Sequence, residues 1–145
     1  MVYLSLGSNL GEREAYLNAA CKVMERLLRV ELVRSEIIET EAVGFEGPAF
    51  LNMAVAFEAP VWLTPESLLD FCQSIEMELG RAPHQAEYNA DGTRRYTSRT
   101  IDIDILKYDD VEISTPRLVL PHPQVASRPF VALLLKDLET KIEIK

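Results

Sequence analysis

The chain has 145 residues, a length that suits one domain, and a formal net charge of −8, with 23 acidic residues against 15 lysines and arginines. Hydrophobic residues make up 48% and charged residues 26%, which is ordinary globular usage and argues against disorder, collagen and coiled coil. The excess of acid also argues against a general nucleic-acid binder, which needs a basic surface.

Cysteine usage and hydropathy indicate the cellular setting. Cys21 and Cys72 lie in apolar, helix-like contexts and are expected to be small buried side chains rather than a disulfide or zinc site. The sequence lacks a run of about 18 apolar residues, so we expect no membrane span. The first residues have no basic segment or cleavage site typical of a signal peptide. A cytoplasmic protein with no membrane partner is therefore expected. We also expect a monomer, and the excess of acid predicts no nucleic-acid partner.

Apolar periodicity predicts strands and helices in alternation along the chain. Strands are expected at Val2–Leu6, Val30–Glu39, Phe50–Glu58, Ile101–Leu106 and Val111–Ile113. Helices are expected at Glu12–Arg29, Glu66–Leu79 and Phe130–Leu138. Segments rich in glycine, proline or polar residues predict loops at 7–11, 40–49, 81–98 and 116–129. Thr64 is a candidate N-cap before Pro65, and Gly80 is a suitable residue to end the second helix.

This order predicts the fold class. A β-α-β-β-α-β order indicates an α+β domain of the ferredoxin-like type, with helices packed on one face of an antiparallel sheet and additional C-terminal elements. Residues 1–145 are expected to form a single domain, and the face of the sheet away from the helices is expected to be open for a site.

Two carboxylates stand out on the most regular predicted strand. Asp102 and Asp104 are two residues apart and share one face, while Ile101, Ile103 and Ile105 point into the core. Side-by-side carboxylates repel each other unless a cation lies between them, and Mg²⁺ is usually held by carboxylates, waters and substrate phosphates. The alternative is an ordinary strand with acidic residues on its wet side, which is the more frequent case for an isolated pair.

Cationic residues gather around this pair although the protein is acidic overall. The arginines of the second half are Arg81, Arg94, Arg95, Arg99, Arg117 and Arg128. A cationic cluster beside a metal-binding pair suits a polyphosphate, whereas any single arginine is more often a solvated surface charge. His122 lies between Pro121 and Pro123, which restrain the backbone, so it is either a donor to a phosphate or a structural loop histidine. Neither a P-loop nor a dinucleotide-binding glycine motif is present.

Several segments taken together carry a specific resemblance. They are Leu6-Gly7-Ser8-Asn9-Leu10-Gly11, Phe50-Leu51-Asn52-Met53-Ala54-Val55, Gln73-Ser74-Ile75-Glu76, Leu79-Gly80-Arg81, Arg99-Thr100-Ile101-Asp102-Ile103-Asp104-Ile105, Arg117-Leu118-Val119-Leu120-Pro121-His122-Pro123 and Arg128-Pro129-Phe130. In this order they resemble the 6-hydroxymethyl-7,8-dihydropterin pyrophosphokinases of folate biosynthesis throughout the chain. The resemblance implies transfer of the terminal pyrophosphoryl group of ATP to the hydroxymethyl oxygen of the dihydropterin, with release of AMP and a need for two Mg²⁺ ions.

The resemblance also implies roles for individual residues. The metal ligands would be Asp102 and Asp104; the catalytic set would be these two with Arg81, Arg99 and Arg128. The ATP-binding set would be Gln73, Glu76, Arg99, Arg117 and His122. The pterin-binding set would be Thr40, Val43, Phe50, Asn52 and Phe130. A flat, polar ring needs two apolar faces and a few directed hydrogen bonds, which the last set can supply. Pro83 stands where the family often has a second arginine, and Arg94 and Arg95 are candidates to replace it.

Two other classes of function remain as alternatives. A ligand-sensing or interaction domain of the same fold would have no need for the aspartate pair. A two-metal phosphohydrolase or nuclease would use paired carboxylates without a pterin. For the enzyme, the polar loops at 40–49 and 81–98 are expected to close over bound substrates.

Overall fold

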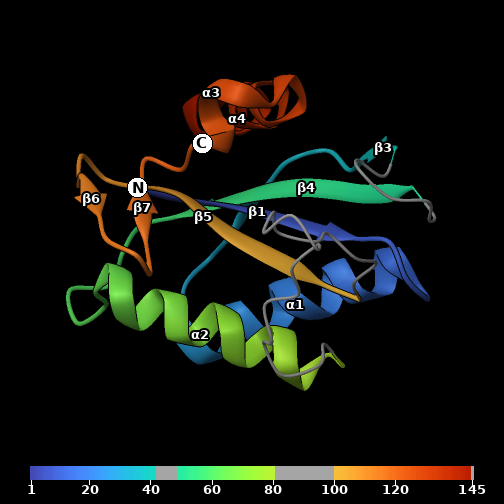
Figure 1. The fold of residues 1–145 in the computed structure, drawn as a ribbon, viewed down its shortest axis with the longest axis horizontal. Helices are drawn as coiled ribbons and strands as arrows, with labels where there is room; N and C mark the ends of the chain where they lie inside the picture. The colour runs from blue at the N-terminus through green and yellow to red at the C-terminus, as the bar shows by residue number, and fades with distance from the viewer. Residues whose placement is uncertain (42–48, 81–99, 145) are drawn as a thin grey trace, which may run out of the picture.

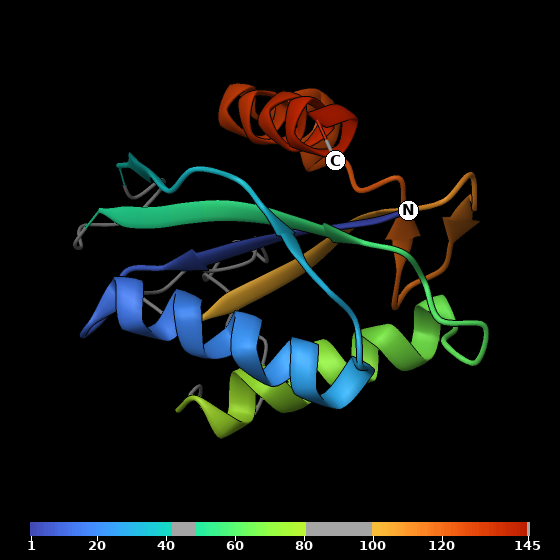
Figure 2. The same cartoon turned by 180° about the vertical axis from the view of Figure 1, so that it is seen from behind.

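The computed structural model describes residues 1–41, 49–80 and 100–144. In this part of the chain an antiparallel sheet lies between helices on both of its sides (Figures 1 and 2). The elements in chain order are β1 Val2–Ser8, α1 Arg13–Leu28, β2 Val33–Arg34, β3 Ile38–Thr40, β4 Phe50–Phe57, α2 Pro65–Glu78, β5 Asp102–Tyr108, β6 Ile113–Ser114, β7 Val119–Leu120, α3 Gln124–Ser127 and α4 Pro129–Ile144. The predicted class, mixed α+β with an antiparallel sheet, is confirmed.

The strand β1 lies inside the sheet, between β4 and β5, and the order of the main path is β2-β4-β1-β5, with β3 also paired to β4. Leu4 and Leu6 of β1 alternate with Ser5 and Gly7, so the strand presents apolar residues to one face and small ones to the other. The predicted loop at 7–11 therefore begins later than expected, because Gly7 and Ser8 continue the ladder of β1.

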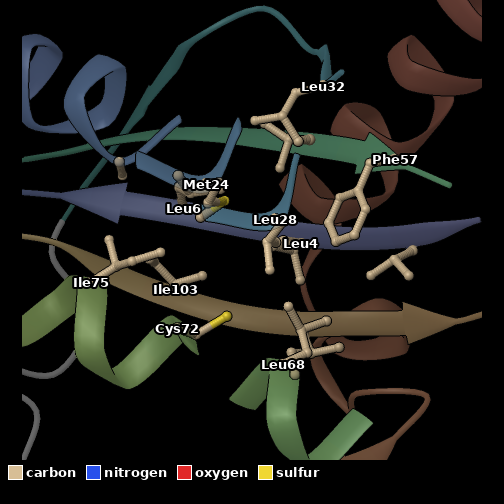
Figure 3. Packing of buried hydrophobic residues seen from close by; sticks show 14 of the residues in the cluster. Leu4, Leu6, Met24, Leu28, Leu32, Phe57, Leu68, Cys72, Ile75 and Ile103 are labelled. Atoms are coloured by element: carbon tan, nitrogen blue, oxygen red, sulfur yellow. The ribbon is translucent and has the colours of Figure 1, made fainter. Parts of the chain in front are cut away.

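The main core lies between the sheet and the helices α1 and α2. Leu4, Leu6 and Ile103 from the sheet are buried against Met24 of α1 and Ile75 of α2, and Figure 3 shows these side chains interleaved in one layer. Burying such side chains is worth about 1.5–3 kcal/mol each relative to leaving them exposed. This layer holds β1, β4 and β5 in a defined register.

The helix α2 begins where the sequence predicts. Thr64 Oγ1 accepts a hydrogen bond from the Ser67 N–H at 3.1 Å, and Ser67 Oγ accepts one from the Thr64 N–H at 2.9 Å, which is a capping box with Pro65 at the first turn. Gly80 follows the helix with a φ of +99°, a conformation that favours glycine.

The second face of the sheet is not open along its whole length, contrary to the expectation from the sequence. The helix α4 covers part of it, and Leu134 and Leu138 pack on Ala54 and Ala56 of β4. Figures 1 and 2 show α4 on the side of the sheet away from α1 and α2. This helix is longer than predicted, because the apolar spacing continues to Ile142, which also packs against the same cluster.

Two predicted segments differ in detail. The strand expected at 30–39 is two strands, β2 and β3, that both pair with β4. The strand expected at 111–113 is β6, which pairs with β7 from the segment expected to be irregular. Both differences arise from pairings with distant or short segments, which alternation alone does not specify. Among the described residues, no helix is both long enough and apolar enough to cross a membrane.

Candidate active site

A row of three residues crosses the sheet at one end. Gly7 of β1 is paired with Asn52 of β4 on one side and with Asp102 of β5 on the other. Directly paired residues in antiparallel strands point to the same face, so the amide and the carboxylate lie on either side of the glycine. A Cβ at Gly7 would lie 3.2 Å from Asn52 Oδ1 and 3.5 Å from Phe50 Cδ1. The glycine therefore leaves room for the amide and the ring against β1.

Two residues of the predicted pterin-binding set contact each other here. Asn52 is only 8% exposed, and its Nδ2 donates a hydrogen bond to Thr40 Oγ1 at 2.7 Å. This bond ties the end of β3 to β4 and orients the amide. A buried, oriented amide can form directed hydrogen bonds with the edge of a polar ring.

The two phenylalanines of the predicted set lie on the same face of the sheet. Phe50 is two residues before Asn52 on β4 and is half-buried. Phe130, in the first turn of α4, is also half-buried and packs against the clusters of Ala54 and of Leu106. Their shared face is consistent with a common ligand, while part of the surface of Phe130 serves to dock α4.

The aspartate pair has the alternation that the sequence predicts. Asp102 and Asp104 are half-buried, whereas Ile101, Ile103 and Ile105 are at most 5% exposed. Asp104 is paired with Ser5 of β1, as Asp102 is with Gly7. Both carboxylates therefore lie beside small residues of the neighbouring strand. This arrangement leaves the carboxylates accessible on a strand whose position is set by the core beneath it.

His122 lies beside the pair because its backbone pairs with β5. Its N–H donates to the Leu106 carbonyl at 2.9 Å, and its Nε2 is 3.9 Å from Asp104 Oδ1. Burial lowers the pKa of His122, as does the nearby Arg128, while the Asp102 carboxylate raises it. The ring is therefore neutral at pH 7. Nδ1 accepts the Gln124 N–H at 3.1 Å, so the proton lies on Nε2, which faces the carboxylates and can donate to an anion.

Arg128 adds a positive charge to the same end of the sheet. It lies between α3 and α4, and its Cζ is 6.0 Å from the centre of the Phe130 ring. Its effect on His122 indicates that it also lies close to the imidazole. The carboxylate pair, the imidazole and the guanidinium, all predicted from the sequence, are thus brought together.

Glu76 has a different environment from that of a typical ligand-binding carboxylate. It lies on α2, is 5% exposed, and its Oε2 accepts the Ile103 N–H of the edge strand β5 at 2.9 Å. Cys72, one turn earlier, is also buried, and burial and the Glu76 and Asp104 carboxylates raise the pKa of its thiol. Glu76 therefore binds the strand that carries the aspartate pair, at the residue between Asp102 and Asp104. Its predicted contact with ATP stays a prediction.

Gln73 and Arg117 lie at the outer side of α2. Both are exposed, and Arg117, from the β6–β7 turn, forms an ion pair with the exposed Asp70. Asp70 and Gln73 are three residues apart on α2 and so lie on one side of the helix. The β6–β7 turn that carries Arg117 leads into β7, which contacts β5.

Part of the predicted site lies outside the described residues. It comprises Val43, Arg81, Arg94, Arg95 and Arg99, with most of the two loops expected to close over substrates. In the ranges that the structure does describe, no group of three or more His, Cys, Asp or Glu side chains could hold a metal ion. Among these residues, the candidate metal ligands are Asp102 and Asp104, and His122 Nε2 lies 3.9 Å from Asp104 Oδ1.

Two features of the site were not predicted from the sequence. Gly7 lies in β1 and not in the predicted loop at 7–11, although the alternation of Tyr3, Ser5 and Gly7 with apolar residues indicates that the strand continues. Asp70, the partner of Arg117, has no signal in the sequence, because the pairing depends on where the β6–β7 turn reaches α2.

Comparisons with known proteins give one consistent result. A sequence profile for the family 7,8-dihydro-6-hydroxymethylpterin-pyrophosphokinase (HPPK) matches residues 3–140. The chain is 42% identical over 139 residues to a 2-amino-4-hydroxy-6-hydroxymethyldihydropteridine pyrophosphokinase of Porphyromonas gingivalis, covering 94% of this chain and 89% of the relative. Proteins of the same name from Bacillus subtilis and Methylorubrum extorquens are 39% and 38% identical, over 99% and 98% of this chain and 80% and 84% of theirs.

Proposed function

The chain belongs to the HPPK family of ATP-dependent pyrophosphokinases in folate biosynthesis, and we propose that it transfers the terminal pyrophosphoryl group of ATP to the hydroxymethyl oxygen of 6-hydroxymethyl-7,8-dihydropterin. AMP is the second product, and the reaction depends on Mg²⁺. The bond that breaks joins the β-phosphorus of ATP to the oxygen that bridges it to the α-phosphorus, and that oxygen leaves with AMP. The bond that forms joins that β-phosphorus to the hydroxymethyl oxygen, whose proton is released.

The observation that carries this proposal is the row Asn52–Gly7–Asp102. It places an oriented amide, suited to the edge of a polar ring, beside a carboxylate pair suited to a metal-bound polyphosphate. Phosphoryl transfer depends mainly on alignment of the two substrates and on neutralisation of charge. Two half-sites separated by one strand, with a glycine at the position between them, are consistent with that requirement.

Asp102 and Asp104 are the proposed ligands of Mg²⁺, with two ions expected. The described donor set fits this metal, because Mg²⁺ is typically held by one or two carboxylates together with substrate phosphates and waters rather than by a complete protein cage. When bound, the metal would neutralise charge on the phosphates. The protein's own contribution is a pair of carboxylates fixed on a strand with a buried opposite face.

The cationic and donor groups around the pair are proposed to bind the triphosphate. Nε2–H of His122 donates to a phosphate oxygen, and Arg128 compensates negative charge near the transferred group. The rim formed by Gln73 and Arg117 borders the nucleotide, with Arg81 and Arg99 as further proposed contacts and Glu76 on the same side. Arg117 would exchange its partner Asp70 for phosphate on binding.

The dihydropterin is proposed to lie over the end of β1 and β4. Phe50 and Phe130 would contact its two faces, Asn52 and Thr40 would bind its edge, and Val43 would contribute from the following loop. The two phenylalanines lie on the face that Gly7 leaves accessible, which supports this placement.

The fold is proposed to be ferredoxin-like and to form one domain over residues 1–145. The path β2-β4-β1-β5 with α1 and α2 on one face supports the first part, and the span of the family match supports the second. The protein is proposed to act as a monomer.

The direct test is an assay of AMP formation. Protein, ATP, Mg²⁺ and 6-hydroxymethyl-7,8-dihydropterin are mixed, and AMP and the pyrophosphorylated pterin are quantified over time. We expect AMP that requires both pterin and Mg²⁺, in equal amount to the pterin product. Release of ADP or phosphate without dependence on pterin would instead indicate a phosphohydrolase and would contradict the proposal.

A further inference from the structure

The connection between β2 and β3 contains an extra residue. Arg34 is paired with Val55 and Ile38 with Asn52, so the three residues 35–37 oppose the two residues 53–54 of β4. This is a β-bulge, which shifts the side chains that follow it relative to the partner strand. The bulge sets the position of Thr40 at the end of β3. In the shifted register, the Thr40 hydroxyl accepts the hydrogen bond from Asn52 Nδ2.

Three side chains hold the bulge, and two of them come from α4. Ser35 Oγ accepts the Ala54 N–H at 2.8 Å and donates to the Glu36 carbonyl at 2.8 Å. Asp137 Oδ2 accepts the Glu36 N–H at 2.8 Å, and Lys141 Nζ donates to the Arg34 carbonyl at 2.9 Å. Asp137 and Lys141 also pair with each other at 3.3 Å, one helical turn apart.

These contacts are suited to positioning rather than to overall stability. Asp137 and Lys141 are about one-third exposed, and an exposed ion pair alone contributes at most about 1 kcal/mol. Here, however, each charged group binds a backbone atom of the bulge, one an N–H and the other a carbonyl. The Glu36 N–H, and to a smaller extent Lys141, lower the pKa of Asp137, so its carboxylate is ionised at neutral pH.

The helix α4 therefore reaches the proposed pterin site at two places. Its first turn carries Phe130, and its last turns hold the bulge that precedes Thr40. We propose that Asp137 and Lys141 are positioning residues for dihydropterin binding, which act by holding the β2–β3 bulge so that Thr40 meets Asn52. This inference rests on the proposed function. It adds two partly exposed residues of α4 to the residues that determine pterin binding.

The test is steady-state kinetics of AMP formation with Asp137→Ala. Loss of the acceptor for the Glu36 N–H is expected to raise KM for the dihydropterin about three- to tenfold, as for loss of one net hydrogen bond, while KM for ATP and kcat change less than about twofold. Asp137→Asn keeps an acceptor for this N–H and is expected to restore most of the affinity. Glu139→Ala removes an exposed carboxylate from the same helix without touching the bulge and is the matched control.

A double substitution tests the path through Thr40. Thr40→Val removes the hydroxyl that Asn52 contacts, and in this background Asp137→Ala is expected to raise KM for the pterin by less than about twofold more, since interacting positions are not additive. Fully multiplicative effects would overturn the proposed path. If Asp137→Ala does not accumulate as folded protein, Lys141→Met replaces it, with the same expected pattern.

Failure of this inference is distinguishable from failure of the proposed site. Asn52→Ala is measured in parallel and should raise KM for the pterin. If Asn52→Ala has its effect and both Asp137→Ala and Lys141→Met leave KM for the pterin unchanged, only the positioning role is wrong. If Asn52→Ala has no effect, or if no pterin-dependent AMP is formed, the proposed site or function is wrong and the inference falls with it.

Discussion

The two faces of the central sheet are made from alternate residues of the same strands, yet at the proposed site they differ in side-chain size and polarity. Toward α1 and α2, β1, β4 and β5 present large apolar side chains such as Leu6, Met53 and Ile103, all nearly inaccessible. Toward the other side, the neighbouring positions are small or polar, as at Gly7, Asn52 and Asp102. The first face holds the strands in register, and the second provides room and polar groups.

The second face is itself divided along the strands. At one end, Ala54 and Ala56 are small enough for α4 to pack closely on β4. At the other end, Gly7 of β1 lies between the buried amide of Asn52 and the half-buried carboxylate of Asp102. The small residues Ala54 and Ala56 let the C-terminal helix dock on this face, and the proposed ligand site lies at the other end.

The largest expected effect is on the polar end of the second face. Asp104→Ala is expected to reduce turnover by about 10²–10³-fold or more, as for loss of a principal electrostatic group, and to change the free energy of unfolding by less than about 1 kcal/mol. AMP formation and urea denaturation measure the two quantities. Asp110→Ala, at an exposed position in the turn after β5, is the control. Turnover within tenfold of the unaltered protein would contradict the assignment of this face.

The converse substitution tests the core face. Leu6→Ala is expected to lower the free energy of unfolding by about 2–5 kcal/mol, because the 1% exposed side chain leaves a cavity between the sheet and α1. Ser5→Ala, on the adjacent residue but the other face, is expected to cost less than about 1 kcal/mol. Both are measured by urea unfolding. Equal costs at the two positions would show that the faces do not differ as described.

Glu76 of α2 binds the backbone of β5 between the two aspartates, and its substitution is expected to have an intermediate effect. Glu76→Leu leaves the buried Ile103 N–H without its acceptor and is expected to cost about 1–3 kcal/mol of stability. Turnover is expected to fall as well, because Ile103 lies between the two aspartates and a displaced backbone there would move both carboxylates. Glu76→Gln keeps an acceptor oxygen and should recover most of both losses. If Glu76→Gln has full stability but a raised KM for ATP, the carboxylate contacts the nucleotide directly, as the resemblance implies.

The last prediction concerns the reactivity of the two buried thiols on α1 and α2, which affects neither turnover nor stability. Burial raises the pKa of Cys21 to about 11, and burial with two nearby carboxylates raises that of Cys72. Because a raised pKa keeps the thiol protonated below that value, both are expected to be neutral and unreactive at pH 8. Reaction with a disulfide reagent should be at least about 100-fold slower than in guanidinium-unfolded protein. Rapid modification of either thiol in the folded protein would contradict a sealed core face.

Much of this protein could be predicted from the sequence because its signals are local. The alternation at 101–106 predicts which side of β5 carries the aspartates, and Thr64 and Pro65 predict the start of α2. The family resemblance, carried by short motifs in a fixed order, predicts the enzyme class. These features depend on side-chain chemistry and spacing within a few residues of each other.

The tertiary structure decided the contacts between distant segments. Gly7 beside Asn52, the Glu76 carboxylate on the Ile103 N–H, and the bulge held by Asp137 all join residues far apart in the chain. The covering of the second face by α4 has the same origin. Apolar periodicity shows that a helix has a face to bury, but the surface it buries that face against is selected by register, residue size and packing across the whole fold.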